Sequence, residues 1–244
     1  MTDNAPRATL YAFSYHGLTD ATVMSIFREW QAWPRLDFHI KGGDANIDRA
    51  RSRVASWFLD SSPETAGDVL LMADSDNAWQ TGDLAMLARR AMEHTAVVGG
   101  IYPKRAFGKG VALWPESGAK LEYVLGEDEL VPVRYVGTGM IAIPRVILER
   151  LSETLDWAED EAGRFQPFFM PFLYDGLYPT DDAAFCRRVR DVGYPVYAST
   201  YPIVTHEGTY VYRVQDGYGK PPDTKPEYRL RLDGVPRLEL VRAE

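Results

Sequence analysis

Two aspartates one residue apart follow an apolar run in "DVLLMADSDNAW", residues 68–79. An apolar run of this length bounded by turn residues is typical of a buried strand, so Asp74 and Asp76 would lie at its carboxyl end. In extended backbone, side chains two residues apart point to the same side. The two carboxylates would repel each other without a cation between them, and oxygen ligands suit Mg²⁺ or Mn²⁺, which also bind substrate phosphates.

Other interpretations of this stretch remain open. Asp-Ser-Asp-Asn is also good turn composition. An EF-hand loop is excluded because Ala78 and Trp79 stand at its fifth and sixth positions and no Glu at its twelfth. A haloacid dehalogenase type of phosphatase also has D-x-D after an apolar strand, but with Thr or Val in place of Ala78 and on the first strand. A nucleotidyltransferase needs the same metal, but the Gly-rich basic loop expected near its N-terminus is absent from the sequence.

Two further groups could take part in chemistry. Asp181 and Asp182 begin the predicted helix "DDAAFCRRVRDVG". An acidic pair stabilises a helix N-terminus through capping and the helix dipole, or one of the two acts as a general base for an acceptor hydroxyl. His206 follows the last predicted strand of this region, where a neutral imidazole would complete a metal shell or play a structural part.

The elements that must position these residues alternate between strand and helix. The sequence predicts strands at 8–17, 36–43, 68–74 and 95–103 and helices at 19–30, 44–61 and 81–94. Continuously apolar strands that alternate with helices indicate a mostly parallel central sheet with helices on both faces. Spacing predicts that the first helix buries Val23, Ile26, Phe27 and Trp30. The second helix is expected to be capped by Asp44 and to bury Ile47, Ala50, Val54, Trp57 and Phe58.

The second half of the chain has a different pattern. Short β-like pieces over residues 110–144 predict antiparallel strands at a small sheet edge, followed by helices at 145–155 and 181–193 and a strand at 194–200. From Gly217 the chain is rich in Pro, Gly and charge, so we expect a loop or extended tail. The predicted organisation is a single domain over 1–216 and a C-terminal extension over 217–244, packed on the domain or trailing from it.

Composition narrows the class of protein. The chain has 244 residues, 45% of them hydrophobic and 25% charged, as in an ordinary globular domain. No apolar run approaches the roughly 18 residues of a membrane span, and the first residues do not resemble a signal peptide. The single cysteine, Cys186, excludes an internal disulfide and predicts a cytoplasmic location. A net charge of −8 argues against broad nucleic-acid binding but leaves room for a local basic groove.

Five segments in a fixed order resemble one family. They are "VLLMADSDNAW", "AVVGGIYPKR", "VGTGMIAIPRVILERL", "TDDAAFCRRVRDVGYPVYAS" and "THEGTYVY". Together with the first strand they resemble, over residues 8–212, the small GT-A glycosyltransferases common in tailed phages and environmental genomes, which are similar to family 2 glycosyltransferases. The resemblance implies a single GT-A (Rossmann-like) α/β domain and a nucleotide-diphosphate sugar as donor, with a UDP-sugar as the first expectation.

The resemblance also implies roles for the acidic residues and the histidine. Asp76 would bind a Mn²⁺ or Mg²⁺ ion that bridges the donor diphosphate, Asp74 would lie nearer the ribose or reach the metal through water, and His206 would be the third metal ligand. Asp182 matches the catalytic aspartate of the family's Glu-Asp pair and would give inversion of the sugar. Here the pair is Asp-Asp, which leaves Asp181 as the other candidate base.

The donor site follows from the same resemblance. Tyr11, Phe13 and Ser14 on the first strand would hold the nucleobase. Arg49 and Arg53 would reach the base or the diphosphate, or form a solvated helix face. Gly137 and Gly139 would let the backbone approach the donor or acceptor closely.

The acceptor stays open in the sequence. Enzymes of this type are expected to modify hydroxymethylated pyrimidines in phage DNA, proteins, glycans or a small metabolite. Two basic clusters, Lys104/Arg105/Lys109 and Arg187/Arg188/Arg190, would follow a phosphate backbone, bind donor phosphate or form surface ion pairs. The aromatic segment "FQPFFMPFLYDGLYP", residues 165–179, would be an acceptor loop with stacking surfaces or a core segment.

Overall fold

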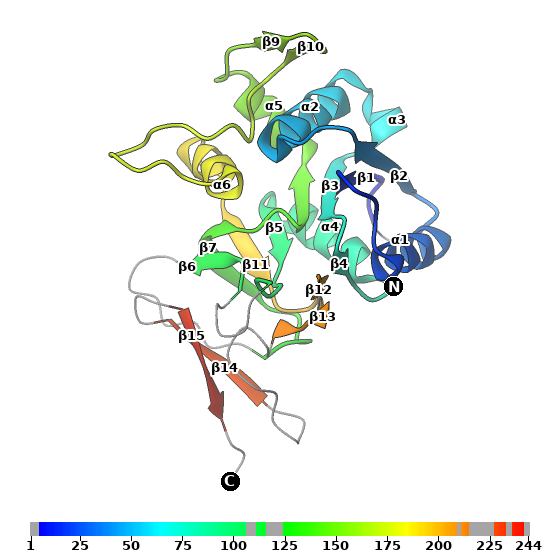
Figure 1. Cartoon of the computed structure of the whole chain (residues 1–244), viewed down its shortest axis with the longest axis vertical. Helices are drawn as coiled ribbons and strands as arrows, with labels where there is room; N and C mark the ends of the chain where they lie inside the picture. The colour runs from blue at the N-terminus through cyan, green and yellow to red at the C-terminus, as the bar shows by residue number, and fades with distance from the viewer. Residues whose placement is uncertain are drawn as a thin grey trace.

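A central sheet of eight strands organises the computed structural model, which describes residues 5–105, 111–115, 124–208, 211–214, 227–232 and 236–241 (Figure 1). The strand order is β2-β1-β3-β8-β5-β11-β7-β6. The strands are β1 (Ala8–Ser14), β2 (Leu36–Gly42), β3 (Val69–Asp74), β5 (Val97–Gly100), β6 (Leu113–Pro115), β7 (Leu130–Val136), β8 (Met140–Pro144) and β11 (Val196–Ser199). β1 pairs in parallel with β2 and β3, and β11 with β5, which confirms the predicted mostly parallel sheet.

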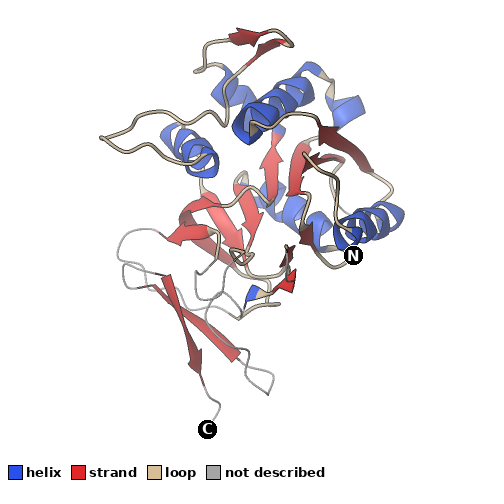
Figure 2. Cartoon of the chain, viewed as in Figure 1, coloured by secondary structure: helices blue, strands red, loops and turns tan. Residues whose placement is uncertain are grey.

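Helices cover both faces of this sheet, as predicted (Figure 2). They are α1 (Asp20–Ala32), α2 (Ile47–Asp60), the short α3 (Pro63–Ala66), α4 (Asp83–His94), α5 (Arg145–Ser152) and α6 (Asp181–Asp191). One apolar core joins the sheet to α2, α5 and α6, and a second joins it to α1 and α4. β3 contributes alternate residues to the two cores, Leu70 and Met72 to one and Leu71 and Ala73 to the other, which explains its continuously apolar sequence.

The antiparallel strands differ from the prediction in one respect. β6 and β7 form an antiparallel edge, as expected. β8, however, lies between β3 and β5 and runs antiparallel to both, in the middle of the sheet. All five residues of β8 are buried, because "MIAIP" has no polar side chain to present to solvent on either face.

Small sheets surround the main one. β4 (Asn77–Ala78), β12 (Thr205–Glu207) and β13 (Val211–Tyr212) form a three-stranded sheet, and β9 (Ala158–Asp160) pairs with β10 (Gly163–Phe165). Near the C-terminus, β14 (Glu227–Leu232) and β15 (Pro236–Val241) form an antiparallel hairpin where the sequence predicted a loop or extended tail. None of the described helices combines the length and apolarity that crossing a membrane requires.

The buried face of α1 is not the predicted one. Ile26 is buried, but Phe27 and Trp30 are 45% and 46% exposed. Thr22 and Ser25 are buried instead, because their hydroxyls donate hydrogen bonds to the backbone after β3: Thr22 Oγ1 to the Asn77 carbonyl (2.8 Å) and Ser25 Oγ to the Trp79 carbonyl (3.0 Å). α1 therefore fixes the segment that carries the two aspartates.

The predicted cap of α2 is also displaced. Asn46 is the N-cap, and the predicted cap Asp44 accepts a hydrogen bond from the Asn46 N–H. Ile47 and Trp57 are exposed rather than buried. The other predicted core positions, Ala50, Val54 and Phe58, are buried as expected.

Glu29 joins α1 to α4. Its fully buried carboxylate accepts hydrogen bonds from Gly82 N (2.8 Å) and Ala85 N (3.1 Å), and so caps a helix that has no side-chain cap of its own. Burial raises the pKa of Glu29 to about 7; the two hydrogen bonds oppose this rise and the charge of Asp83 adds to it.

We expect the protein to lose stability as the pH rises from about 4.5 to about 7. The folded state binds the Glu29 proton more tightly than the unfolded state does, whose value is 4.5, so ionisation in this window favours unfolding. The loss has an upper bound of about 3 kcal/mol, at about 1.4 kcal/mol per pKa unit. Urea unfolding at pH 5, 6, 7 and 8 measures it. Glu29→Gln should flatten the profile and the exposed Glu149→Gln should not; equal slopes in all three proteins would show that Glu29 does not titrate in this way.

Candidate functional site

A cleft of about 360 Å³ lies at the carboxyl ends of β1 and β3, beside the start of α2. In an open α/β sheet this edge is where ligands bind. The side chains that line the cleft are those of Phe13, Ser14, Tyr15, Lys41, Asp44, Ala45, Ile47, Ala50, Arg51, Asp74, Ser75, Asp76, Tyr102, Arg105 and His206. The cleft therefore brings together the D-x-D aspartates, the late histidine and part of β1.

Arg51 lies in the wall of this cleft and binds two acids from distant parts of the chain. One guanidinium nitrogen donates to Asp74 Oδ1 at the end of β3, and another to Asp181 Oδ2 at the start of α6. The Arg51 residue is only 4% exposed, and its guanidinium lies 5.6 Å from the centre of the Phe13 ring. Burial lowers the pKa of Arg51, but the charges of Asp74 and Asp181 outweigh it and hold the pKa above its ordinary value.

Asp76 meets His206 on the other side of the cleft. The distance from Asp76 Oδ1 to His206 Nε2 is 3.3 Å, and Arg105 Nη1 lies 2.8 Å from Asp76 Oδ2. Burial raises the pKa of Asp76, but the His206 hydrogen bond and the charges of His206 and Arg105 outweigh it, so the pKa lies below its ordinary value. The two residues predicted to bind a metal together therefore do lie side by side.

The contact of the second ring nitrogen of His206 indicates which of its two nitrogens carries the proton. Nδ1 lies 2.8 Å from the Pro103 carbonyl oxygen, which can only accept, so Nδ1 carries the proton. A neutral His206 then presents the lone pair of Nε2 to a carboxylate oxygen. Two acceptors at this distance need a cation between them, either a proton on Nε2 or a metal ion. The positions of Asp76 Oδ1 and His206 Nε2 thus fit two ligand atoms of one metal ion.

Asp74 does not complete a three-ligand group with this pair. Within the described ranges of the chain, no three His, Cys, Asp or Glu side chains come together in a group that could hold a metal ion. Asp74 is bound by Arg51, and its backbone N–H donates to the Gly139 carbonyl (3.0 Å). A metal ion at Asp76 and His206 would need ligands from water or a substrate, as Mg²⁺ commonly does.

Asp182 begins α6 next to Asp181. Its Oδ1 accepts hydrogen bonds from the Thr180 hydroxyl and from Ala183 N (2.7 Å). Burial raises the pKa of Asp182; the charge of Asp181 adds to this rise, while the Thr180 and Ala183 hydrogen bonds and the charge of Arg51 oppose it, and the pKa stays above its ordinary value. A carboxylate with a raised pKa is a stronger base than an ordinary aspartate.

Gly137 and Gly139 lie against protein side chains and are not among the residues that line the cleft. A Cβ at Gly137 would lie 2.1 Å from the Tyr102 hydroxyl oxygen, and one at Gly139 would lie 2.4 Å from Asn77 Nδ2. Gly139 N also donates to the Tyr102 oxygen (3.0 Å), and Asn77 Nδ2 donates to the Gly139 carbonyl (2.8 Å). The two glycines give Tyr102 and Asn77 the space to pack below the D-x-D segment.

The residues predicted on β1 divide between two places. Phe13 and Ser14 line the cleft, as does Tyr15. Tyr11 does not line it and stacks on His39 of β2, with ring centres 4.9 Å apart. The cleft therefore has an aromatic side at the end of β1, but Tyr11 lies outside it.

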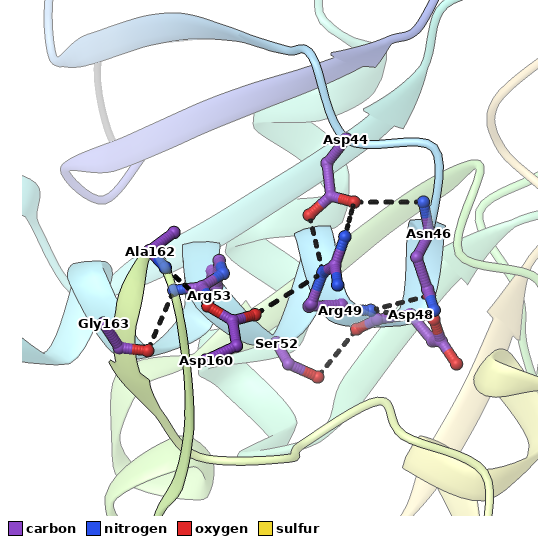
Figure 3. A network of polar contacts seen from close by, with 9 residues as sticks. All are labelled: Asp44, Asn46, Asp48, Arg49, Ser52, Arg53, Asp160, Ala162 and Gly163. Carbon is purple, nitrogen blue, oxygen red and sulfur yellow. Dashed lines mark hydrogen bonds and ion pairs between the residues drawn. The ribbon is translucent and has the colours of Figure 1, made fainter.

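Arg49 and Arg53 belong to a different network (Figure 3). Arg49 Nη2 lies 2.7 Å from Asp44 Oδ1, and Arg53 binds Asp160 of β9. Asp160 also lies 3.8 Å from Arg49 Nε. These contacts join α2 to the β9–β10 hairpin. Both arginines line a second cleft, which adjoins the first through Lys41 and Asp44.

Arg51, the arginine between them, was missed by the sequence analysis. In a helix, residues 49 and 53 share a face, while residue 51 shares one with 55 and 58. Ala55 and Phe58 are buried, so the same periodicity that marks the core of α2 also marks Arg51. Arg105 and Thr180, the other polar partners of the acids, carry no comparable signal, because they lie in loops.

The remaining predicted segments have mixed outcomes. Phe165, Phe168 and Phe169 are core residues, whereas Leu173, Tyr174, Leu177 and Tyr178 are exposed, so the aromatic segment is half core and half surface. Of the basic clusters, Arg105 pairs with Asp76, Arg187 pairs with Asp191, and Arg188 donates to the Phe168 carbonyl. Lys109 lies outside the described residues.

Comparisons with known proteins relate the chain to others through its fold. No protein-family model matches the chain, and a search of curated proteins found no match. Among solved structures, A197 from STIV has a TM-score of 0.53 at 16% identity, over 97% of this chain and 95% of that one.

Two further solved structures are similar. GalNAc-T7 with UDP, GalNAc and Mn²⁺ has a TM-score of 0.52 at 12% identity, over 90% of this chain but 46% of that one. S. aureus TarS has a TM-score of 0.46 at 11% identity, over 80% of this chain and 58% of that one. The chain thus spans less than half the length of the GalNAc-T7 chain. The predicted GT-A-like α/β fold is confirmed.

We predict that Arg51→Met destabilises the protein far more than Arg49→Met, two residues away on the same helix. Removing Arg51 leaves two carboxylates without their buried counter-ion, which costs on the order of 3 kcal/mol. Arg49 is 39% exposed at its side chain, and loss of a surface ion pair costs roughly 0–1 kcal/mol. Chemical unfolding measures both. Asp74→Asn with Asp181→Asn should recover part of the Arg51→Met loss; an equal effect of the two arginine variants would contradict the assignment.

Proposed function

We propose that this protein is a divalent-metal-dependent glycosyltransferase, which moves a sugar from a nucleotide-diphosphate sugar, a UDP-sugar in the first instance, to a hydroxyl group. The observation that carries the proposal is that Asp76 Oδ1 and His206 Nε2 lie 3.3 Å apart in the cleft, while His206 Nδ1 faces the Pro103 carbonyl. A protein of similar fold, GalNAc-T7, was crystallised with UDP, GalNAc and Mn²⁺, which supports this choice of donor and metal.

Asp76 and His206 would hold the Mn²⁺ or Mg²⁺ ion. When bound, the ion supplies positive charge that stabilises the diphosphate leaving group. Asp74, whose Oδ1 is bound by Arg51, would face the ribose or reach the ion through water. Arg105, 57% exposed at its side chain, would exchange its contact with Asp76 for the donor diphosphate.

The nucleotide would lie along the end of β1. Phe13, Ser14 and Tyr15 offer an aromatic and polar wall, and Lys41 lines the same cleft. Arg49 and Arg53 would reach the base only from the adjoining cleft, because each already has an acidic partner. Tyr11 would support this wall through its contact with His39 rather than bind the base itself.

Asp182 would act as the base. The Thr180 hydroxyl and Ala183 N both bind its Oδ1, which orients the carboxylate. It would take the proton of the acceptor hydroxyl as that oxygen bonds to the anomeric carbon, and an in-line attack gives inversion. Asp181 is bound by Arg51 and would hold the base in position rather than take the proton.

The experiments below also test two alternative functions. A haloacid dehalogenase type of phosphatase would need a free carboxylate as nucleophile. Asp74 and Asp76 each have a cationic partner in this structure, which disfavours that function. A non-catalytic nucleotide-sugar-binding protein would bind donor without turnover.

We further propose that residues 1–216 form the catalytic domain, that 217–244 form an extension of it, and that the protein acts in the cytoplasm.

We expect one nucleotide sugar to bind in the presence of Mn²⁺ and to lose at least tenfold in affinity with EDTA. Asp76→Ala and His206→Ala should each cause a loss of similar size, because each removes one metal ligand. Calorimetry across a panel of nucleotide sugars measures this binding. Asp156→Asn, an exposed aspartate away from the cleft, is the control. Absence of donor binding with any metal, or hydrolysis of an aryl phosphate, would overturn the proposal.

Asp182→Asn should reduce transfer by about 10²–10⁴-fold and leave donor binding intact, because it removes the proton acceptor and not a ligand of the donor. Since burial and Asp181 raise the pKa of Asp182, the acid limb of kcat/KM should lie above the pH at which an ordinary aspartate titrates. A radiolabelled donor measures transfer. Full activity of Asp182→Asn would exclude this residue as the base.

A further inference from the structure

A protruding loop stands directly before the proposed base. Residues 172–179, which we call the tongue, connect the buried aromatic segment to α6 and project from the body of the protein (Figure 1). Tyr174 and Leu177 exchange two backbone hydrogen bonds, of 2.9 and 2.8 Å, across Asp175 and Gly176. Both of these central residues have positive φ, 47° and 74°, as in a type I′ turn.

The tongue is fixed to the same helix that carries the base. The Arg187 guanidinium lies 3.8 Å from the centre of the Tyr174 ring, and the Arg188 guanidinium lies 4.3 Å from that of Phe172. Arg187 also pairs with Asp191, and Arg188 donates to the Phe168 carbonyl (3.3 Å). The tongue is therefore held in a defined position relative to Asp182, about one and a half turns of helix away from these arginines.

The outer surface of the tongue is apolar. Leu173, Leu177 and Tyr178 are 74%, 70% and 74% exposed, the highest values among the exposed large apolar side chains that the structure describes. Neighbouring exposed apolar side chains of this kind mark surfaces that bind another molecule. The two leucines are suited to contact with other apolar side chains, whereas a sugar ring or a nucleobase stacks on aromatic rings. Of the two exposed tyrosines of the tongue, Tyr174 is 41% exposed and its ring already lies against Arg187.

An open cleft continues from the tongue to the donor site. It has a volume of about 590 Å³ and is lined by Ala45, Asn46, Ile47, Asp48, Arg49, Pro171, Thr180 and Asp181. Ala45 and Ile47 also line the donor cleft, so the two spaces adjoin. Pro171 and Thr180 are the residues on either side of the tongue, so a chain lying on the tongue can enter this cleft.

The charge of this surface is slightly negative. The tongue contains Asp175 and no Lys or Arg. In the cleft behind it Asp181 is paired with Arg51 and the one basic residue, Arg49, is paired with Asp44, which leaves Asp48. A nucleic acid needs cations along its phosphates, and an anionic membrane surface needs basic residues beside the apolar ones. A polypeptide that is apolar and neutral or basic needs no such cations on the surface that binds it.

From these observations we infer that the acceptor is a polypeptide, modified on a Ser or Thr hydroxyl that apolar residues flank, and that the tongue binds those flanking residues. The inference rests on the proposed function, since it names the acceptor of that reaction. The acceptor oxygen bonds to the anomeric carbon, the bond from that carbon to the donor diphosphate breaks, and the hydroxyl proton passes to Asp182.

The test compares two double variants that each remove two exposed apolar side chains. Leu173→Ser with Leu177→Ser alters the tongue without touching its backbone hydrogen bonds. Met24→Ser with Val146→Ser alters α1 and α5 at side chains that are 47% and 43% exposed and away from the cleft. Each protein receives radiolabelled donor and three acceptors: a Ser/Thr peptide library, hydroxymethylcytosine-containing DNA and a panel of aryl glycosides.

The expected result is label in peptides with apolar residues beside the hydroxyl, and an increase of at least tenfold in peptide KM for the tongue variant alone. Donor binding and slow donor hydrolysis should be equal in all proteins, which separates this test from that of the proposed function. Label in DNA or glycosides but not in peptides would overturn the inference. So would donor hydrolysis without label in any peptide, or an unchanged peptide KM in the tongue variant.

Discussion

The ion pairs of Arg51 connect the parts of the chain on which the site depends. Its guanidinium binds Asp74 at the end of β3 and Asp181 at the start of α6, residues more than a hundred positions apart in the sequence. Without a buried cation these two carboxylates would repel each other, and the end of β3 and the first turn of α6 would separate. Because both carboxylates bind the same planar guanidinium group, the sheet edge and the helix are fixed relative to each other. Arg51 and Asp74 both line the donor cleft, so this contact also fixes one wall of it.

The two aspartates of the D-x-D segment have different partners in the fold. Asp74 belongs to the Arg51 ion pairs and is thereby structural, whereas Asp76, two residues later, turns to His206 and Arg105. The backbone between them is held by a hydrogen bond from a hydroxyl group of α1. A strand end that was merely extended would direct both carboxylates to the same side, and the change of direction lets one support the site while the other is available to a metal ion.

In our proposal, the helix α6 connects the catalytic base to the surface that binds the acceptor. Its first turn carries Asp181 and Asp182, and its second turn carries Arg187 and Arg188, which hold the tongue through aromatic rings. Both basic side chains had been candidates for binding a phosphate backbone. Because both arginines are engaged in contacts within the protein, the tongue surface beside α6 is apolar and slightly acidic. This distribution of charge is what favours a polypeptide over a nucleic acid as the acceptor in our proposal.

The sequence by itself determined the alternation of strands and helices, the burial of β3 and the grouping of an acidic pair, a D-x-D and a late histidine. These are local properties, because periodicity and turn composition depend on neighbouring residues. Only the tertiary structure decided that β8 lies in the centre of the sheet, since an apolar strand does not specify its partners. It also decided that Arg51, and not Arg49 or Arg53, reaches the site. A charge is stable in the interior only where opposite charges or hydrogen-bond partners from elsewhere in the chain meet it, and no local pattern records where that happens.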